Sequence, residues 1–195
     1  MFDIELRVKL PNDRRNTGTI ELIDTTTGLV LHGPRPILGR ADRKTAAAKQ
    51  NPNGVATLPY GDTPTGTYRV PIIHATGPGT PYDAMVYGNT GAIRLEPTGG
   101  DAAVAATNGR TGLLIHAGRQ PPVPNPPLES HLKPTNGCLR MIESDFRALI
   151  DAIGQQAGAL PGNLTVTVGP GGAPGGADQG IDDGDPPPQG GRVYP

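Results

Sequence analysis

The chain carries one cysteine, Cys138, directly after a glycine, and a histidine, His116, at the end of an apolar run that begins at Leu113. A thiol and an imidazole from two segments are the minimal set for cysteine acyl transfer, in which the thiol attacks a carbonyl carbon and the imidazole takes the proton. By residue type alone, a lone cysteine is more often a small buried hydrophobic side chain. The surroundings of Cys138 therefore decide between the two interpretations.

The segment before Cys138 is turn-prone. A Thr-Asn-Gly sequence at 135–137 follows a proline-rich stretch at 121–134, so we expect the thiol in a loop. Gly137 has no side chain to obstruct a substrate carbonyl, and the amides of Gly137 and Cys138 can point toward a developing oxyanion. A helix expected directly after the cysteine would bring its positive end near the thiol and favour the thiolate.

The four histidines differ in their surroundings. His116 is a candidate general base, although a structural histidine bonded to backbone is equally expected at such a position. His32 and His74 lie in strand-like runs and are expected to be structural or surface residues. His131 lies shortly before Cys138 in the same loop, where it is either a second imidazole of the site or, more often in such loops, a solvent-exposed side chain.

The elements that must position these residues are mostly strands. Residues 2–10 alternate apolar and charged side chains, which is typical of a strand with one buried face. A hairpin is expected around 24–27, where Asp and Gly favour a turn. Short strands separated by turn residues are typical of a sandwich or barrel. Beyond 2–10, the expected strands are 19–23, 28–32, 36–39, 67–73, 84–87, 92–95, 113–116 and 164–168.

Two helices are expected. A short one covers 101–106, with Asp101 as its cap and a stop at Asn108 and Gly109. A longer one covers 144–156 directly after the cysteine, with Ser144 or Glu143 as its cap. Its apolar residues recur at helical spacing, and Gly158 and Pro161 follow its end; the apolar residues are Phe146, Leu149, Ile150 and Ile153.

Composition favours one folded domain. Of 195 residues, 29 are glycine and 23 are proline, and many of these lie near the C-terminus, so we expect a domain at 1–169 and a Gly/Pro-rich flexible tail at 170–195. A net charge of −1 gives no basic stripe for nucleic acid and no cationic helix for a membrane surface. One cysteine allows no intrachain disulfide. Charges within 2–10 argue against a signal peptide, and no stretch is apolar enough for a membrane span.

Three segments together resemble the catalytic domain of the L,D-transpeptidases, the YkuD family. They are 62–70, with the sequence Asp-Thr-Pro-Thr-Gly-Thr-Tyr-Arg-Val, then 114–116, Leu-Ile-His, and 135–141, Thr-Asn-Gly-Cys-Leu-Arg-Met, followed by a helix. The family motif is a His, a spacer, then Ser or Thr, His, Gly and Cys, a hydrophobic residue and commonly Arg. The resemblance extends over about residues 18–168.

The resemblance implies a mainly β, sandwich-like fold with one short helix and one longer helix after the catalytic cysteine. It implies that Cys138 is the nucleophile, that His116 is the base and later the acid, and that the amides of Gly137 and Cys138 form the oxyanion site. Thr135 would orient the histidine, and Arg140 would support the site or hold a substrate carboxylate. The implied substrate is a peptidoglycan stem peptide, and the thiol chemistry needs no metal or organic cofactor.

Two departures from the family motif stand out. The spacer at 117–134 is one residue longer than usual, which a proline-rich loop can absorb. Asn136 stands where the family usually has histidine, and asparagine does not titrate. Any role of that second imidazole in tuning the thiol is therefore lost or passes to another group such as His131. Arg140, Asn136 and His131 are the candidate substrate-binding residues.

Three functions follow as expectations. The first is an L,D-transpeptidase or L,D-carboxypeptidase acting on peptidoglycan, with transpeptidation and hydrolysis both open. The second is an antibacterial effector with the same chemistry, secreted without a leader by a type VI-like route and accompanied by a secretion-system or immunity partner. The third is a catalytically degenerate wall-binding or structural module, with Asn136 as its mark. Without a signal peptide, the chain is expected to be made and held in the cytoplasm and to act in the periplasm or cell wall.

Overall fold

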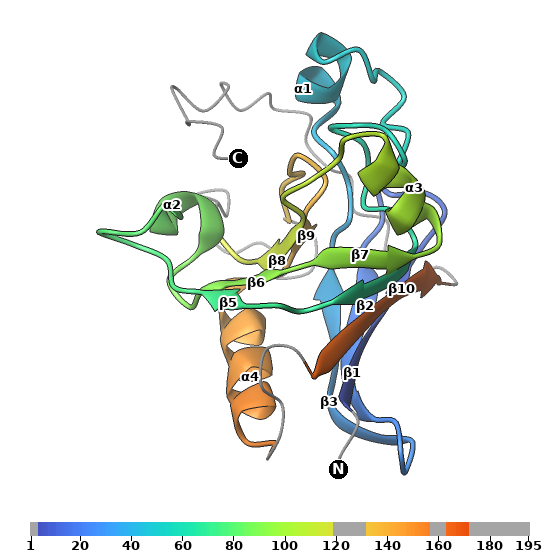
Figure 1. Cartoon of the computed structure of the whole chain (residues 1–195). Helices are drawn as coiled ribbons and strands as arrows, with labels where there is room; N and C mark the ends of the chain where they lie inside the picture. Colours follow the sequence, from blue (N-terminus) through green and yellow to red (C-terminus); the bar gives the residue numbers. More distant parts are fainter. Residues whose placement is uncertain (1–3, 119–131, 157–162, 172–195) are drawn as a thin grey trace.

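The computed structural model describes residues 4–118, 132–156 and 163–171 (Figure 1). These residues form two mixed sheets and four helices. Buried side chains from both sheets and from the longest helix belong to one hydrophobic core. The prediction of a mainly β chain is confirmed, and neither of the two described sheets closes into a barrel.

The larger sheet has six strands in the order β3-β2-β1-β10-β4-β7. Strands β1 and β10 pair in parallel, and the other neighbours are antiparallel. The strands are β1 (Ile4–Leu10), β2 (Gly18–Asp24), β3 (Leu29–Ile37), β4 (Gly66–Arg69), β7 (Glu96–Gly99) and β10 (Leu164–Pro170).

Alternation in the sequence accounts for the centre of this sheet. In β1 the apolar residues at every second position, among them Leu6 and Val8, are buried, while Arg7 and Lys9 are exposed. Leu6 pairs with Val166 of β10, whose apolar residues are also buried. Because side chains alternate between the faces of a strand, both strands place one apolar face in the core. The strand expected at 2–10 is confirmed over its described residues.

The smaller sheet has the order β5-β6-β8-β9. Strands β8 and β9 pair in parallel, and the other pairs are antiparallel. Side chains of Ile93, Ile115 and Leu139 reach the same core as the larger sheet. The strands are β5 (Ile73–His74), β6 (Ala92–Arg94), β8 (Leu114–His116) and β9 (Leu139–Arg140).

The helices lie outside the two sheets (Figure 1). The longest, α4, buries Phe146, Leu149 and Ile153 and packs against β2 and β3, so the helical periodicity is confirmed. None of the described helices is long and apolar enough to cross a membrane. The four helices are α1 (Arg43–Ala48), α2 (Ala84–Tyr87), α3 (Asp101–Thr107) and α4 (Glu143–Gly154).

The strand predicted at 84–87 is wrong, because Ala84–Tyr87 forms the helix α2. The carboxylate of Asp83 accepts a hydrogen bond from the amide of Met85 at 2.8 Å, which caps the helix. Gly88 ends it with a φ of 86°. A short apolar run does not distinguish a strand from one helical turn, and here the cap decides.

Other boundaries also differ from those predicted. The strand expected at 67–73 is two strands, β4 and β5, separated around Pro71, which has no amide to donate. Of the strand expected at 36–39, only Pro36 and Ile37 lie in a strand, at the end of β3. Neither predicted helix has the predicted side-chain cap: Gly100 and Ile142 occupy the N-cap positions of α3 and α4.

Three elements were not predicted. Helix α1 buries only Ala46, so it has no apolar periodicity, although Asp42 caps it. Strand β7 is an edge strand that contains Pro97, a residue that argues against a strand in a sequence. Strand β9 has two residues. The predicted flexible tail, 170–195, lies outside the described residues from residue 172 onward, and Pro170 belongs to β10.

Candidate active site

Strands β8 and β9 bring the two candidate catalytic residues to one face of the smaller sheet. Ile115 pairs with Leu139, and His116 pairs with Arg140. Paired residues point to the same face, and neighbours along a strand point to opposite faces. Ile115 and Leu139 therefore face the core, while His116 and Arg140 lie on the other face together with Cys138, which directly precedes β9.

His116 is buried, with 2% of its surface exposed. Its Nδ1 lies 2.6 Å from the carbonyl oxygen of Ala117, so Nδ1 carries the hydrogen and Nε2 holds the lone pair. Burial, with the nearby charge of Arg140, lowers the pKa of His116 to about 3. At neutral pH the imidazole is therefore neutral and in the tautomer that accepts a proton at Nε2.

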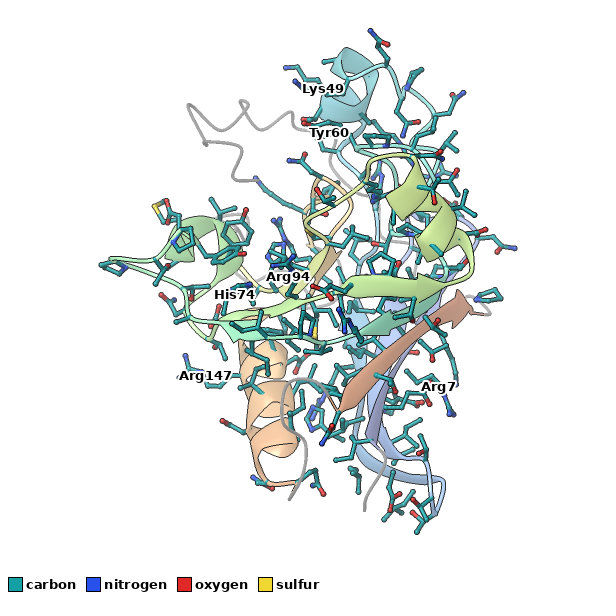
Figure 2. The ribbon with its side chains drawn as sticks, viewed as in Figure 1. Arg7, Lys49, Tyr60, His74, Arg94 and Arg147 are labelled. Carbon is teal, nitrogen blue, oxygen red and sulfur yellow. The ribbon has the colours of Figure 1, made fainter. Side chains whose placement is uncertain are left out.

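A row of aromatic rings leads from the edge of the smaller sheet to His116. The ring centroid of Tyr87, in α2, lies 5.0 Å from that of His116 in an edge-on arrangement. Tyr82 packs against Tyr87 at 5.2 Å, and His74 of β5, labelled in Figure 2, lies 4.6 Å from Tyr82. His74 thus packs in this row, as a structural residue, and the rings seal His116 from solvent on the side of α2.

Cys138 is partly exposed. Its thiol donates a hydrogen bond to the carbonyl oxygen of Gly112, with 3.7 Å between sulfur and oxygen, and the amide of Leu114 donates to the sulfur. Burial of the sulfur raises the pKa of Cys138, although the Leu114 amide and the charges of Arg110 and Arg140 oppose the rise. The expected preference for a thiolate is not met, and the resting residue is a protonated thiol.

The thiol and the imidazole are both neutral and do not bond to each other in the resting site. Among the described residues, Cys138 bonds to the backbone at Gly112 and Leu114, and His116 bonds to Ala117. Catalytic hydrogen bonds commonly form only when substrate is bound, and a general base works best with a pKa near the operating pH, so the burial that lowers the pKa of His116 makes it a weak base in this resting arrangement.

Thr135 closes the turn that carries the cysteine. Its hydroxyl accepts a hydrogen bond from the amide of Gly137 at 2.9 Å and donates one to the carbonyl of Cys138 at 2.8 Å. Thr135 therefore orients the Cys138 turn, as threonine does when it bonds locally to backbone, while its implied role in orienting His116 stays a prediction. The Gly137 amide is engaged by Thr135 as well, so the Cys138 amide is the better oxyanion donor of the two.

Gly137 is held from two further directions. Its carbonyl accepts hydrogen bonds from the hydroxyl of Thr63 at 2.9 Å and from Nη2 of Arg110 at 3.3 Å. Its φ is +101°, and a Cβ at this position would collide with Arg110 and with the carbonyl oxygen of Gly61. The 62–70 segment thus contributes to the site through Thr63, which is fully buried.

We predict that Gly137→Ala lowers the free energy of unfolding by roughly 2–5 kcal/mol, the sum of the strain at positive φ and the collision of the new Cβ. Gly109→Ala is the matched control, since Gly109 has a φ of +81° and nothing within 4 Å of the added Cβ. Urea unfolding of both variants separates the two contributions. Equal losses would show that the contacts of Gly137 add nothing to the strain.

The three candidate substrate-binding residues differ in placement. Arg140 is 4% exposed, and its Nη1 donates to the carbonyl of Lys133 at 3.1 Å. Its burial favours the supporting role over display to a substrate carboxylate. Asn136 is exposed and forms a backbone bridge with Ala41. His131 lies outside the described residues.

Sequence reasoning missed Arg110, Tyr87 and the role of Glu143. No motif marks Arg110, and Tyr87 fell in the segment predicted as a strand. Glu143 was expected only as a cap, yet its carboxylate accepts hydrogen bonds from the amide of Asn89 at 3.1 Å and the hydroxyl of Thr90 at 2.5 Å. It thereby ties the segment after α2 to the start of α4.

Within the described part of the chain, His, Cys, Asp and Glu side chains form no group of three that could hold a metal ion. A scan against models of known protein families finds no match to the chain, and a search among curated proteins finds no similar sequence.

Proposed function

We propose that the chain is a cysteine acyl-transfer enzyme that acts on peptidoglycan stem peptides as an L,D-transpeptidase, an L,D-carboxypeptidase or both. The observation that carries the proposal is the pairing of β8 with β9, which places Cys138 and a neutral His116 on one face of the sheet. Two sheets around one core also suit the sandwich-like fold that the resemblance implies.

In the acylation step, Sγ of Cys138 attacks the carbonyl carbon of a meso-diaminopimelate residue in the stem peptide. The thiol proton passes to Nε2 of His116 as the carbon–sulfur bond forms. His116 then gives this proton to the nitrogen of the terminal D-alanine, and the carbon–nitrogen bond breaks. A thioester and free D-alanine result. The Nδ1 hydrogen bond to Ala117 holds the ring in the required tautomer throughout.

In the second step, an amine or a water molecule attacks the thioester carbonyl. His116 removes a proton from the attacking group, and the sulfur leaves and regains a proton. An amine yields a crosslink or an exchanged D-amino acid, and water yields the shortened peptide. The backbone amide of Cys138 is the candidate donor to the oxyanion in both steps.

The test is incubation of the full chain with disaccharide tetrapeptide, followed by mass spectrometry. Release of D-alanine, together with a dimer, an exchange product or a tripeptide, is expected. Protein alkylated beforehand with iodoacetamide is the control and should give none of these products. Absence of all products from untreated protein would overturn the proposal.

A carbapenem separates this function from a non-catalytic wall-binding module. A working site should be acylated at Cys138 with one carbapenem per chain, because the strained lactam carbonyl takes the place of the peptide carbonyl. Intact-protein mass and peptide mapping measure the adduct. A chain that remains unmodified and releases no D-alanine would instead fit the degenerate module.

A further inference from the structure

Arg110 is a buried cation beside the Cys138 turn. It follows α3 and is 4% exposed. Its guanidinium donates only to backbone carbonyl oxygens among the described contacts. Nη1 bonds to Ala56, to Leu58 at 3.4 Å and to Asp62 at 2.7 Å, and Nη2 bonds to Gly61 at 2.7 Å and to Gly137 at 3.3 Å.

The charge of Arg110 has no carboxylate bonded to it in the described structure. Asp62, whose charge acts on Arg110, is committed elsewhere: its carboxylate accepts hydrogen bonds from the amide of Ala41 and from Arg43, both at 2.8 Å. Carbonyl dipoles satisfy the donors of Arg110 but do not cancel its charge. The field of the guanidinium therefore reaches Cys138, one residue beyond the carbonyl that Arg110 holds.

We propose that Arg110 is a positioning residue that fixes the Cys138 turn through the Gly137 carbonyl and supplies a permanent positive charge favouring the thiolate and the oxyanion. This inference rests on the proposed function. In the family that the chain resembles, a histidine stands where this chain has Asn136, which does not titrate and is exposed. A guanidinium stays charged throughout the working pH range, so its effect does not switch with pH as an imidazole's would.

Among the described residues around Cys138, neither His116 nor Tyr87 titrates between pH 6 and 9. Arg140, on β9, remains charged, and His116, on β8, remains neutral because its pKa is about 3. Tyr87, on α2, has its pKa raised by burial and by the neighbouring Cys138, so its phenol stays protonated. The dependence of the Cys138 alkylation rate on pH therefore reports the ionisation of the thiol itself, because the charges of Arg110 and Arg140 stay constant.

The experiment measures the rate of Cys138 alkylation by iodoacetamide against pH, for the full chain and for Arg110→Gln. We expect the midpoint of the curve to rise by about one pH unit in the variant. Arg69→Gln is the control, since Arg69 is exposed and pairs with Glu96 in the larger sheet, and its midpoint should match that of the unaltered chain. A folded Arg110→Gln variant with an unchanged midpoint would overturn the proposal.

Arg110→Lys decides the question if the glutamine variant does not fold. Lysine keeps the charge, so the midpoint should stay in place, but one ammonium cannot replace both Nη1, which holds the carbonyl of Asp62, and Nη2, which holds that of Gly137. Hydrogen exchange at 135–138 should then be faster. A shifted midpoint, or unchanged exchange, contradicts the proposal. Alkylation needs no peptidoglycan, so a chain that releases no D-alanine but shows these shifts would disprove the proposed function and retain the role of Arg110.

Discussion

Replacement of Cys138 by alanine is expected to abolish D-alanine release and carbapenem acylation. The thioester requires the sulfur, and removal of a catalytic nucleophile typically costs at least about 10⁴-fold in rate. The fold should survive, because Cys138 is partly exposed and its sulfur makes only weak hydrogen bonds, to the backbone of Gly112 and Leu114. Mass spectrometry of the products after incubation with disaccharide tetrapeptide measures the loss.

Ser144→Ala is the matched control for this variant. Ser144 is an exposed small polar residue near the start of α4, so its loss should leave the rate within a few-fold of that of the unaltered chain. Cys138→Ala with D-alanine release equal to that of the control would assign the reaction to another group. Loss of release in both variants would point to a general defect of this region.

Alternation predicted the strands that bury one continuous face. In β1 and β10 buried and more exposed residues alternate. The alternation of apolar and polar residues in the sequence therefore predicts both strands. In α2 the apolar run that predicted a strand has only four residues, and the carboxylate of Asp83 caps a helix there instead. For α1, with Ala46 as its one buried residue, there was no periodicity to detect.

The residues of the site also divide into those that the sequence predicted and those that it did not. Residue types pointed to Cys138 and His116, because thiol and imidazole chemistry is visible in a sequence. The roles of Thr135 and Arg110 depend on where backbone carbonyls and amides lie after folding. Arg110 reaches Gly61 and Gly137 across long stretches of chain, and no spacing rule joins these three positions.

His116→Gln is expected to lower the rate of D-alanine release by roughly 10²–10⁴-fold, the usual contribution of a general base. Glutamine can hydrogen-bond in the same space, but it does not accept the thiol proton. The variant should also alter the dependence of stability on pH. The folded pKa of His116 is about 3, whereas an unfolded histidine titrates near about 6.5.

The sign of that dependence follows from proton uptake. Between pH 6.5 and 3 the unfolded chain binds a proton at His116 that the folded chain does not, so the stability due to neutral His116 is complete above pH 6.5 and is lost as the pH falls. The loss approaches about 1.4 kcal/mol per pH unit. Urea unfolding of the original chain at pH 7.5 and pH 4.5 should show this decline, and His116→Gln should show a smaller one.

His32→Gln is the control for stability. His32 is less buried than His116, and burial together with Arg35 also lowers its pKa, so its removal should reduce the decline less than removal of His116 does. An equal reduction in the two variants would mean that the surroundings of His116 lower its pKa no more than those of His32 lower the pKa of His32. The pKa of His116 would then lie nearer the ordinary value of about 6.5, at which the imidazole is still mostly neutral at pH 7.5 and is a stronger base for the proton of Cys138.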